Sequence, residues 1–186
     1  NKQMVTTVVD AAIAAGIYVI IDWHSHWSAD TSNPQRQTKA IQFFQEMATA
    51  YGNNPNVIYE IWNEPDYYTW PEVKEYSERV IGAIRAIDKD NIILVGSPHW
   101  DQDLDAVAAD PIKGQANIMY TMHFYAGTHK QWLRDRTDAT AVLFAGDDVT
   151  DEDALRSLVP GDVGVRVGAG ETAAIVRVAG IPELAD

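Results

Sequence analysis

Apolar residues recur along this chain in two alternating patterns, one typical of helices and the other typical of buried strands. In residues 4–15 (MVTTVVDAAIAA) the apolar side chains share one helical face, and Gly16 is a natural end for that helix. Residues 17–23 (IYVIIDW) form a continuous apolar run rich in β-branched residues, which predicts a strand buried on both faces. Further helices are predicted from Pro34 to about Tyr51, from Pro71 to about Ile87, near 103–109, around Trp132 and Leu133, and near 151–159. Further strands are predicted at 57–63, 92–96, 118–124, 141–146, 163–168 and 174–178.

Strand and helix alternate throughout, which is typical of a parallel sheet with right-handed crossovers and flanking helices. No linker rich in Pro, Gly or Ser interrupts the alternation. We therefore expect an α/β fold in which residues 1–186 form one domain around one continuous, mainly parallel sheet. The pattern fits both a sheet that curls like part of a barrel and a flat, doubly wound sheet. An exposed sheet edge would also allow a homodimer.

Composition excludes several classes of partner. No apolar run approaches the roughly 18–20 residues that a membrane span needs, and no signal peptide opens the sequence, so we expect a soluble protein without a membrane partner. The net charge of −13 repels phosphate backbones, so nucleic acid is not an expected partner. The absence of cysteine excludes disulfides and thiolate metal sites but leaves the compartment undecided.

The composition changes abruptly near residue 135. All six Trp, all eight Tyr and all five His precede this point, whereas Gly, Ala, Val and Asp dominate after it. The contrast predicts two fragments of different origin, at 1–135 and 136–186, within one hybrid domain. The join falls inside a helix-to-strand connection.

Polar and aromatic residues recur where four predicted strands end. The segments are DWHSHW (22–27), WNEPD (62–66), SPHW (97–100) and HFY (123–125). Because the carboxyl ends of parallel strands in a barrel face one site, these residues predict a shared cleft. A single buried Trp or His is more often structural, but four successive strand ends favour a functional site.

The stretches IYVIIDWHSH, VIYEIWNEP, IILVGSPHW and YTMHFYAGTHKQWLRD closely resemble bacterial endoglucanases of glycoside hydrolase family 5, retaining cellulases on a TIM barrel. The resemblance covers about residues 1–135 and implies the third to sixth barrel strands, with β-glucan as the ligand. It implies that Glu64 is the acid/base and that Asn63 holds the sugar 2-hydroxyl. It also implies three residues that line the cleaved subsite: His24, His123 and Tyr125. Two tryptophans are predicted to stack on sugar faces: Trp100 and Trp27.

Retaining hydrolysis needs two carboxyl groups about 5–5.5 Å apart. In the family the nucleophile is a Glu at the end of the seventh strand, and no segment of this sequence matches that stretch. Asp147 could stand in, but it falls one position beyond the aligned Gly146 and its side chain is one methylene shorter.

The segment AVLFAGDDVTDEDA (141–154) carries a second candidate site. Clustered carboxylates favour Mg²⁺, which predicts a vestigial metal site at Asp147, Asp148 and Asp151. The alternative is helix capping by Thr150 or Asp151. AVLFAGDDVTDEDALRSL, GDVGVRVGAGETAA and VRVAGIPEL resemble the C-terminal part of trehalose-6-phosphate phosphatases of the haloacid dehalogenase superfamily, over about 139–186. That resemblance implies Rossmann-like strands, but the family's nucleophilic Asp loop and phosphate-binding Lys have no counterpart.

These observations lead to the prediction of an engineered chimera of cellulase and phosphatase fragments. It would lack efficient catalysis, require no cofactor and retain weak glucan binding. Two alternatives stay open: residual endo-β-1,4-glucanase activity through Glu64, and a Mg-dependent phosphatase remnant. A natural truncated cellulase is a further reading. The cellulase parent would be secreted, whereas a designed hybrid would come from recombinant cytoplasmic expression.

Overall fold

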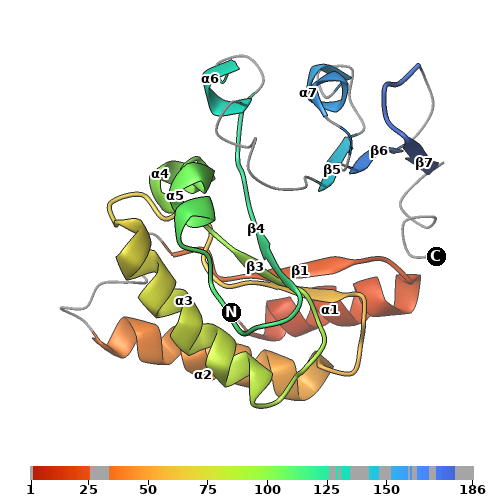
Figure 1. Ribbon diagram of the computed structural model, residues 1–186. Coiled ribbons are helices and arrows are strands. Elements are labelled where there is room, and N and C mark those ends of the chain that lie inside the picture. Colours follow the sequence, from red (N-terminus) through yellow and green to blue (C-terminus); the bar gives the residue numbers. More distant parts are fainter. Residues whose placement is uncertain are drawn as a thin grey trace. The chain divides into compact units, whose positions relative to one another are not determined.

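The computed structural model describes residues 2–25, 34–125, 129, 131–134, 143–146, 152–158, 160, 163–167 and 171–178. The chain divides into two compact units, Asn1–His123 and Phe124–Asp186 (Figure 1). None of the described helices is long and apolar enough to cross a membrane.

The first unit is built on a four-stranded parallel sheet whose spatial order, β1-β2-β3-β4, follows the chain. The strands are β1 (Val19–Asp22), β2 (Val57–Glu60), β3 (Ile93–Val95) and β4 (Ile118–Tyr120). The helices are α1 (Lys2–Ala15), α2 (Pro34–Tyr51), α3 (Trp70–Arg85), α4 (Pro98–Asp101) and α5 (Leu104–Ala109). Each parallel pair therefore needs a crossover connection, and α2 and α3 provide the first two.

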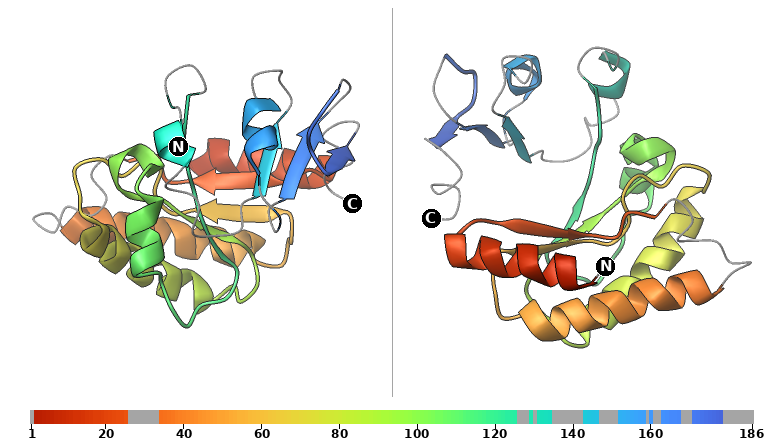
Figure 2. Two further views of the ribbon diagram at one scale, coloured as in Figure 1. Left: turned by 45° about the horizontal axis from the view of Figure 1, so that its top comes forward. Right: turned by 180° about the vertical axis from the view of Figure 1, so that it is seen from behind.

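Helices α1, α2 and α3 lie on one side of this sheet (Figures 1 and 2). The core between them is apolar and contains fully buried side chains from β2, α2 and α3, including Tyr59, Phe44 and Ile84. The start of α3 is well determined by local sequence. Thr69 and Glu72 form a capping box there, and Pro71 occupies the first turn, where its missing N–H costs nothing.

The second unit contains the helices α6 (Gln131–Arg134) and α7 (Glu152–Ser157). Its parallel three-stranded sheet has the order β5-β6-β7, with β5 (Leu143–Gly146), β6 (Val163–Val167) and β7 (Val176–Val178). The described strands thus form one parallel sheet in each unit, and the expectation of one continuous sheet stays a prediction. Among the described strands β4 pairs with β3 alone, and β5 pairs with β6.

The predicted helices and strands are present, and most strands are one to four residues shorter than the apolar runs that predicted them. Strand-helix alternation in parallel sheets confirms the α/β class. The short helix α4 was not predicted, because its residues His99 and Trp100 adopt positive φ angles of 52° and 57°. The predicted domain boundary at 135/136 and the predicted homodimer stay predictions.

Candidate active site

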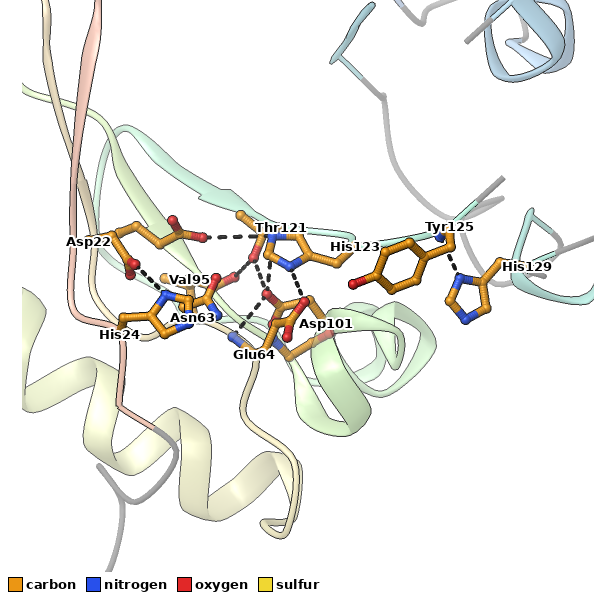
Figure 3. Close-up of polar contacts among 12 residues, drawn as sticks. Asp22, His24, Asn63, Glu64, Val95, Asp101, Thr121, His123, Tyr125 and His129 are labelled. Carbon is orange, nitrogen blue, oxygen red and sulfur yellow. Dashed lines mark hydrogen bonds and ion pairs between the residues drawn. The ribbon is translucent and has the colours of Figure 1, made fainter. Parts of the chain in front are cut away.

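Polar side chains at the ends of the four strands of the first unit come together in one network (Figure 3). The strand β1 ends at Asp22, and β2 leads into Asn63 and Glu64. The other two contributions follow β3 and β4 and include Asp101 and His123. A parallel sheet produces this arrangement because all its carboxyl ends lie along one edge.

Glu64 lies at the centre of this network. Its Oε1 is 2.8 Å from Nδ1 of His123, and 29% of its side-chain surface is exposed. Its backbone has a φ of 50°, which is uncommon for a residue with a side chain. The carboxyl group is therefore held by a neighbour yet open to solvent, as a proton donor to a bound molecule has to be.

Asn63 and His24 form a second chain of contacts beside Glu64. Nδ2 of Asn63 lies 3.4 Å from Nε2 of His24, and Nδ1 of His24 lies 2.9 Å from Oδ2 of Asp22. Burial raises the pKa of Asp22, while its hydrogen bond with His24 acts in the opposite direction. Asp22 thus orients the imidazole, and the imidazole orients the Asn63 amide.

His123 faces three carboxyl groups. Besides Glu64 at Nδ1, its Nε2 lies 3.6 Å from Oδ2 of Asp101 and 3.9 Å from Oε1 of Glu60. Burial disfavours the charged imidazole, but the hydrogen bond with Glu64 and the charges of the three acids outweigh it and raise the pKa of His123. His123 therefore holds its proton to higher pH than an exposed histidine does, and both of its ring nitrogens are directed at acids.

Two of those acids are buried. Glu60 is 8% exposed and Asp101 is fully buried. Burial raises the pKa of Glu60, and it raises the pKa of Asp101 to about 7 even though His123, Ser97 and Thr121 act against it. Both carboxyl groups therefore hold protons more tightly than exposed acids do.

Sequence reasoning identified Glu64, Asn63, His24 and His123, all of which the structure brings together. It missed three residues of the same network, Glu60, Asp101 and Thr121, and it placed Asp22 in the predicted cleft segment DWHSHW without giving it a role. Asp101 directly follows the predicted Trp100, so an acid next to a strand-end aromatic residue was the available signal.

The other residues predicted from the sequence lie in different parts of the structure or outside the described residues. Trp100 is 48% exposed on α4, and its backbone N–H donates to the carbonyl of Pro65 at 3.1 Å. Tyr125 belongs to the second unit, where its N–H donates to Nδ1 of His129 at 2.7 Å, and its role at the cleaved subsite stays a prediction. Four residues lie outside the described residues: Trp27, Asp147, Asp148 and Asp151.

Glu60, Asp101 and His123 each offer one atom within 4.8 Å of the others, a spacing compatible with a metal ion. However, the oxygens of Asp101 accept hydrogen bonds from Ser97, Thr121 and Glu64, and Nδ1 of His123 faces Glu64. Contacts within the protein therefore account for this cluster without a metal.

A family model described as cellulase, glycosyl hydrolase family 5, matches residues 1–158. The chain belongs to glycosyl hydrolase family 5. Endoglucanase Z of Dickeya dadantii is 56% identical over 137 residues, which is 73% of this chain and 31% of that protein. The chain thus spans about a third of the length of this relative.

Solved structures are also similar to this chain. A structure from Cytophaga hutchinsonii is 40% identical with a TM-score of 0.73, and the match covers 98% of this chain and 65% of that one. The catalytic domain of Thermobifida fusca endoglucanase Cel5A in complex with cellotetraose is 33% identical with a TM-score of 0.65, covering 81% and 53%. The family's hydrolysis proceeds through carboxyl groups and requires no cofactor, as expected from the sequence.

The family match corrects the function predicted from the sequence. A single family model runs through residues 136–158, where the change in composition had suggested a fragment of different origin and the resemblance had suggested a phosphatase. The reading of the chain as an engineered chimera without efficient catalysis is therefore wrong. These matches are to cellulases and endoglucanases, so they support the glucanase alternative. They give no support to the phosphatase resemblance.

Proposed function

We propose that this chain supports endo-β-1,4-glucanase chemistry, with Glu64 as the acid/base. The observation that carries the proposal is the position of Glu64: it is partly exposed and its Oε1 lies 2.8 Å from Nδ1 of His123 at the carboxyl end of the sheet. In a retaining reaction this group first protonates the leaving oxygen and then activates water.

The neighbouring residues have roles that fit this chemistry. Asn63 is proposed to hold the sugar 2-hydroxyl, since its amide is fixed by His24. A hydrogen bond to that hydroxyl strengthens in the transition state of glycoside hydrolysis. His24 and His123 are proposed to line the subsite, and the half-exposed Trp100 is proposed to stack on a sugar ring.

The substrate is proposed to be a soluble β-1,4-linked glucan. Support comes from the endoglucanase relatives and from the cellotetraose complex of the Thermobifida fusca enzyme. A retaining reaction also needs a nucleophilic carboxyl group. Asp147 is the sequence's candidate for it and, lying outside the described residues, stays a prediction.

The experiment is a reducing-sugar assay on carboxymethyl cellulose with the unaltered chain, Glu64→Gln and Glu75→Gln. Glu75 is an exposed acid of α3 that pairs with Arg79, so it is a matched control. We expect Glu64→Gln to lower the rate by about 10²- to 10⁴-fold and Glu75→Gln to leave it unchanged. Equal rates for the unaltered chain and Glu64→Gln would refute the proposal.

A further inference from the structure

Asp101 is a fully buried carboxylate that no catalytic step in the proposed hydrolysis uses. It comes from the short helix α4, and its oxygens reach groups that follow three different strands. Oδ1 accepts from the backbone N–H of Ser97 at 2.7 Å. Oδ2 accepts from Oγ1 of Thr121 at 3.1 Å and from the backbone N–H of Glu64 at 3.4 Å. One side chain thus connects the ends of β2, β3 and β4.

The same residue holds His123 from two directions. The backbone carbonyl of Asp101 accepts from the backbone N–H of His123 at 3.1 Å. Its Oδ2 lies 3.6 Å from Nε2 of the imidazole, whose other nitrogen contacts Glu64. Asp101 therefore contacts both the acid and the histidine that faces it.

The backbone that carries Asp101 is strained. Three successive residues, His99, Trp100 and Asp101, have φ angles of 52°, 57° and 60°. Residues with a Cβ seldom adopt this conformation even singly, and such strain persists only where the surroundings enforce it. Here it turns Trp100 outward and Asp101 inward, and Trp100 N–H bonds to Pro65, directly after Glu64.

We propose that Asp101 is a positioning residue that fixes Glu64 and His123 in their reactive geometry by binding the Glu64 amide and facing the His123 imidazole. This inference rests on the proposed function for its catalytic part. Loss of the carboxylate would release both groups, and displacement by about 1 Å can cost about 10²-fold in rate. Binding of glucan by exposed residues would change little.

The test uses Asp101→Asn in the full chain, with Asp110→Asn as the control. Asp110 is an exposed acid that pairs with Lys74, so its replacement removes one charge from the same unit. We expect Asp101→Asn to lower kcat on a soluble cellulose derivative by about 10- to 100-fold with KM nearly unchanged. Asp110→Asn is expected to leave both within about 2-fold. An unchanged kcat for Asp101→Asn, or a loss confined to KM, would overturn the proposal.

A second readout does not depend on turnover. NMR titration of the His123 imidazole reports the groups that face it, which are Glu64, Glu60 and Asp101. We expect Asp101→Asn to move the His123 midpoint to lower pH and Asp110→Asn to leave it in place. If the unaltered chain has no turnover while this midpoint still shifts, then the proposed function fails but the contact of Asp101 stands. An unmoved midpoint would overturn the role of Asp101.

Thr121→Val covers the case in which Asp101→Asn does not fold. This change removes one donor to Oδ2 and keeps the buried charge and the side-chain shape. We expect kcat to fall about 2- to 10-fold, because one of the three hydrogen bonds that orient the carboxylate is lost. A folded Thr121→Val variant with unaltered kcat would count against the proposal.

Discussion

Nδ1 of His123 lies 2.8 Å from Oε1 of Glu64, although 59 residues separate the two in sequence. The parallel sheet explains the encounter. Glu64 follows β2 and His123 follows β4, so both emerge at the same edge with β3 between them. The chemistry of the site therefore depends on the register of three strands and on the short connections that leave them.

The surroundings of Gly96 show how closely the segments that follow these strands pack. A Cβ added there would lie 2.6 Å from both Oδ1 of Asp101 and the carbonyl of Trp62, and 2.7 Å from Cδ of Pro65. Since backbone and ring atoms cannot yield easily, we expect Gly96→Ala to destabilise the fold by about 1–3 kcal/mol and to lower glucanase activity. Chemical denaturation and the carboxymethyl cellulose assay measure the two effects.

Gly82 provides the matched glycine. It lies inside α3, and a Cβ there would meet nothing within 4 Å. Gly82→Ala is expected to stabilise the protein by about 0.5–1 kcal/mol and to leave activity unchanged. Equal effects of the two substitutions would contradict the close packing inferred around Asp101.

Tyr76 anchors the end of β2 from α3. Its hydroxyl donates to the carbonyl of Ile61 at 2.8 Å, and its ring packs against Trp62 with centroids 5.0 Å apart. Tyr76→Phe keeps the ring but leaves a buried carbonyl without this donor, so a loss of about 1–3 kcal/mol is expected on urea denaturation. The half-exposed Tyr18 is the control, and Tyr18→Phe should change stability by less than about 0.5 kcal/mol. A Tyr76→Phe variant as stable as the control would rule out this anchor.

The buried acids predict how stability depends on pH. The pKa of Asp101 is raised from 3.8 to about 7, so between these values the folded protein retains a proton that the unfolded chain releases. The free energy of unfolding therefore falls as pH rises through this window. The raised pKa of His123 extends the same trend above its ordinary value of 6.5. Denaturation curves between pH 4 and pH 8 measure the free energy of unfolding, and its decrease with pH should be smaller in Asp101→Asn. Stability that rises over this range would contradict the burial of Asp101.

Trp100 is predicted to bind the sugar by stacking. Its ring is half exposed beside the site, so Trp100→Ala should raise KM on soluble glucan about 2- to 10-fold with little change in kcat. Trp100→Phe retains a stacking face and should recover most of the affinity. Both constants come from initial rates. A fall in kcat at constant KM would instead indicate that Trp100 helps to position Glu64 and does not bind the sugar.

The periodicity of the sequence was sufficient for the described helices and strands other than α4, and for half of the site. The strands β1 to β4 are predictable because buried parallel strands are continuous apolar runs, and the polar residues that end them include Glu64 and His123. The sequence offered the position of Asp101 next to Trp100 as a signal, but the burial of its carboxyl group was not predictable, since the residues SPHWDQ do not indicate three successive left-handed residues. Its buried carboxyl group depends on that conformation.

One expectation failed for a reason that a local pattern cannot reveal. The change in composition near residue 135 suggested a foreign fragment, whereas the family model continues to residue 158. Composition varies within a family while the sequence of elements persists, so it was a poor guide to origin here.

The role of Glu64 as acid/base is tested most directly by chemical rescue. An activated aryl β-cellobioside needs no acid for its first step, so Glu64→Ala should still form a glycosyl-enzyme that is slow to react with water. Added azide, which needs no general base, is predicted to restore turnover at least about tenfold and to give the β-cellobiosyl azide. With an unaltered chain that turns over the same substrate, no rescue, or an α-cellobiosyl azide, would contradict the assignment of Glu64.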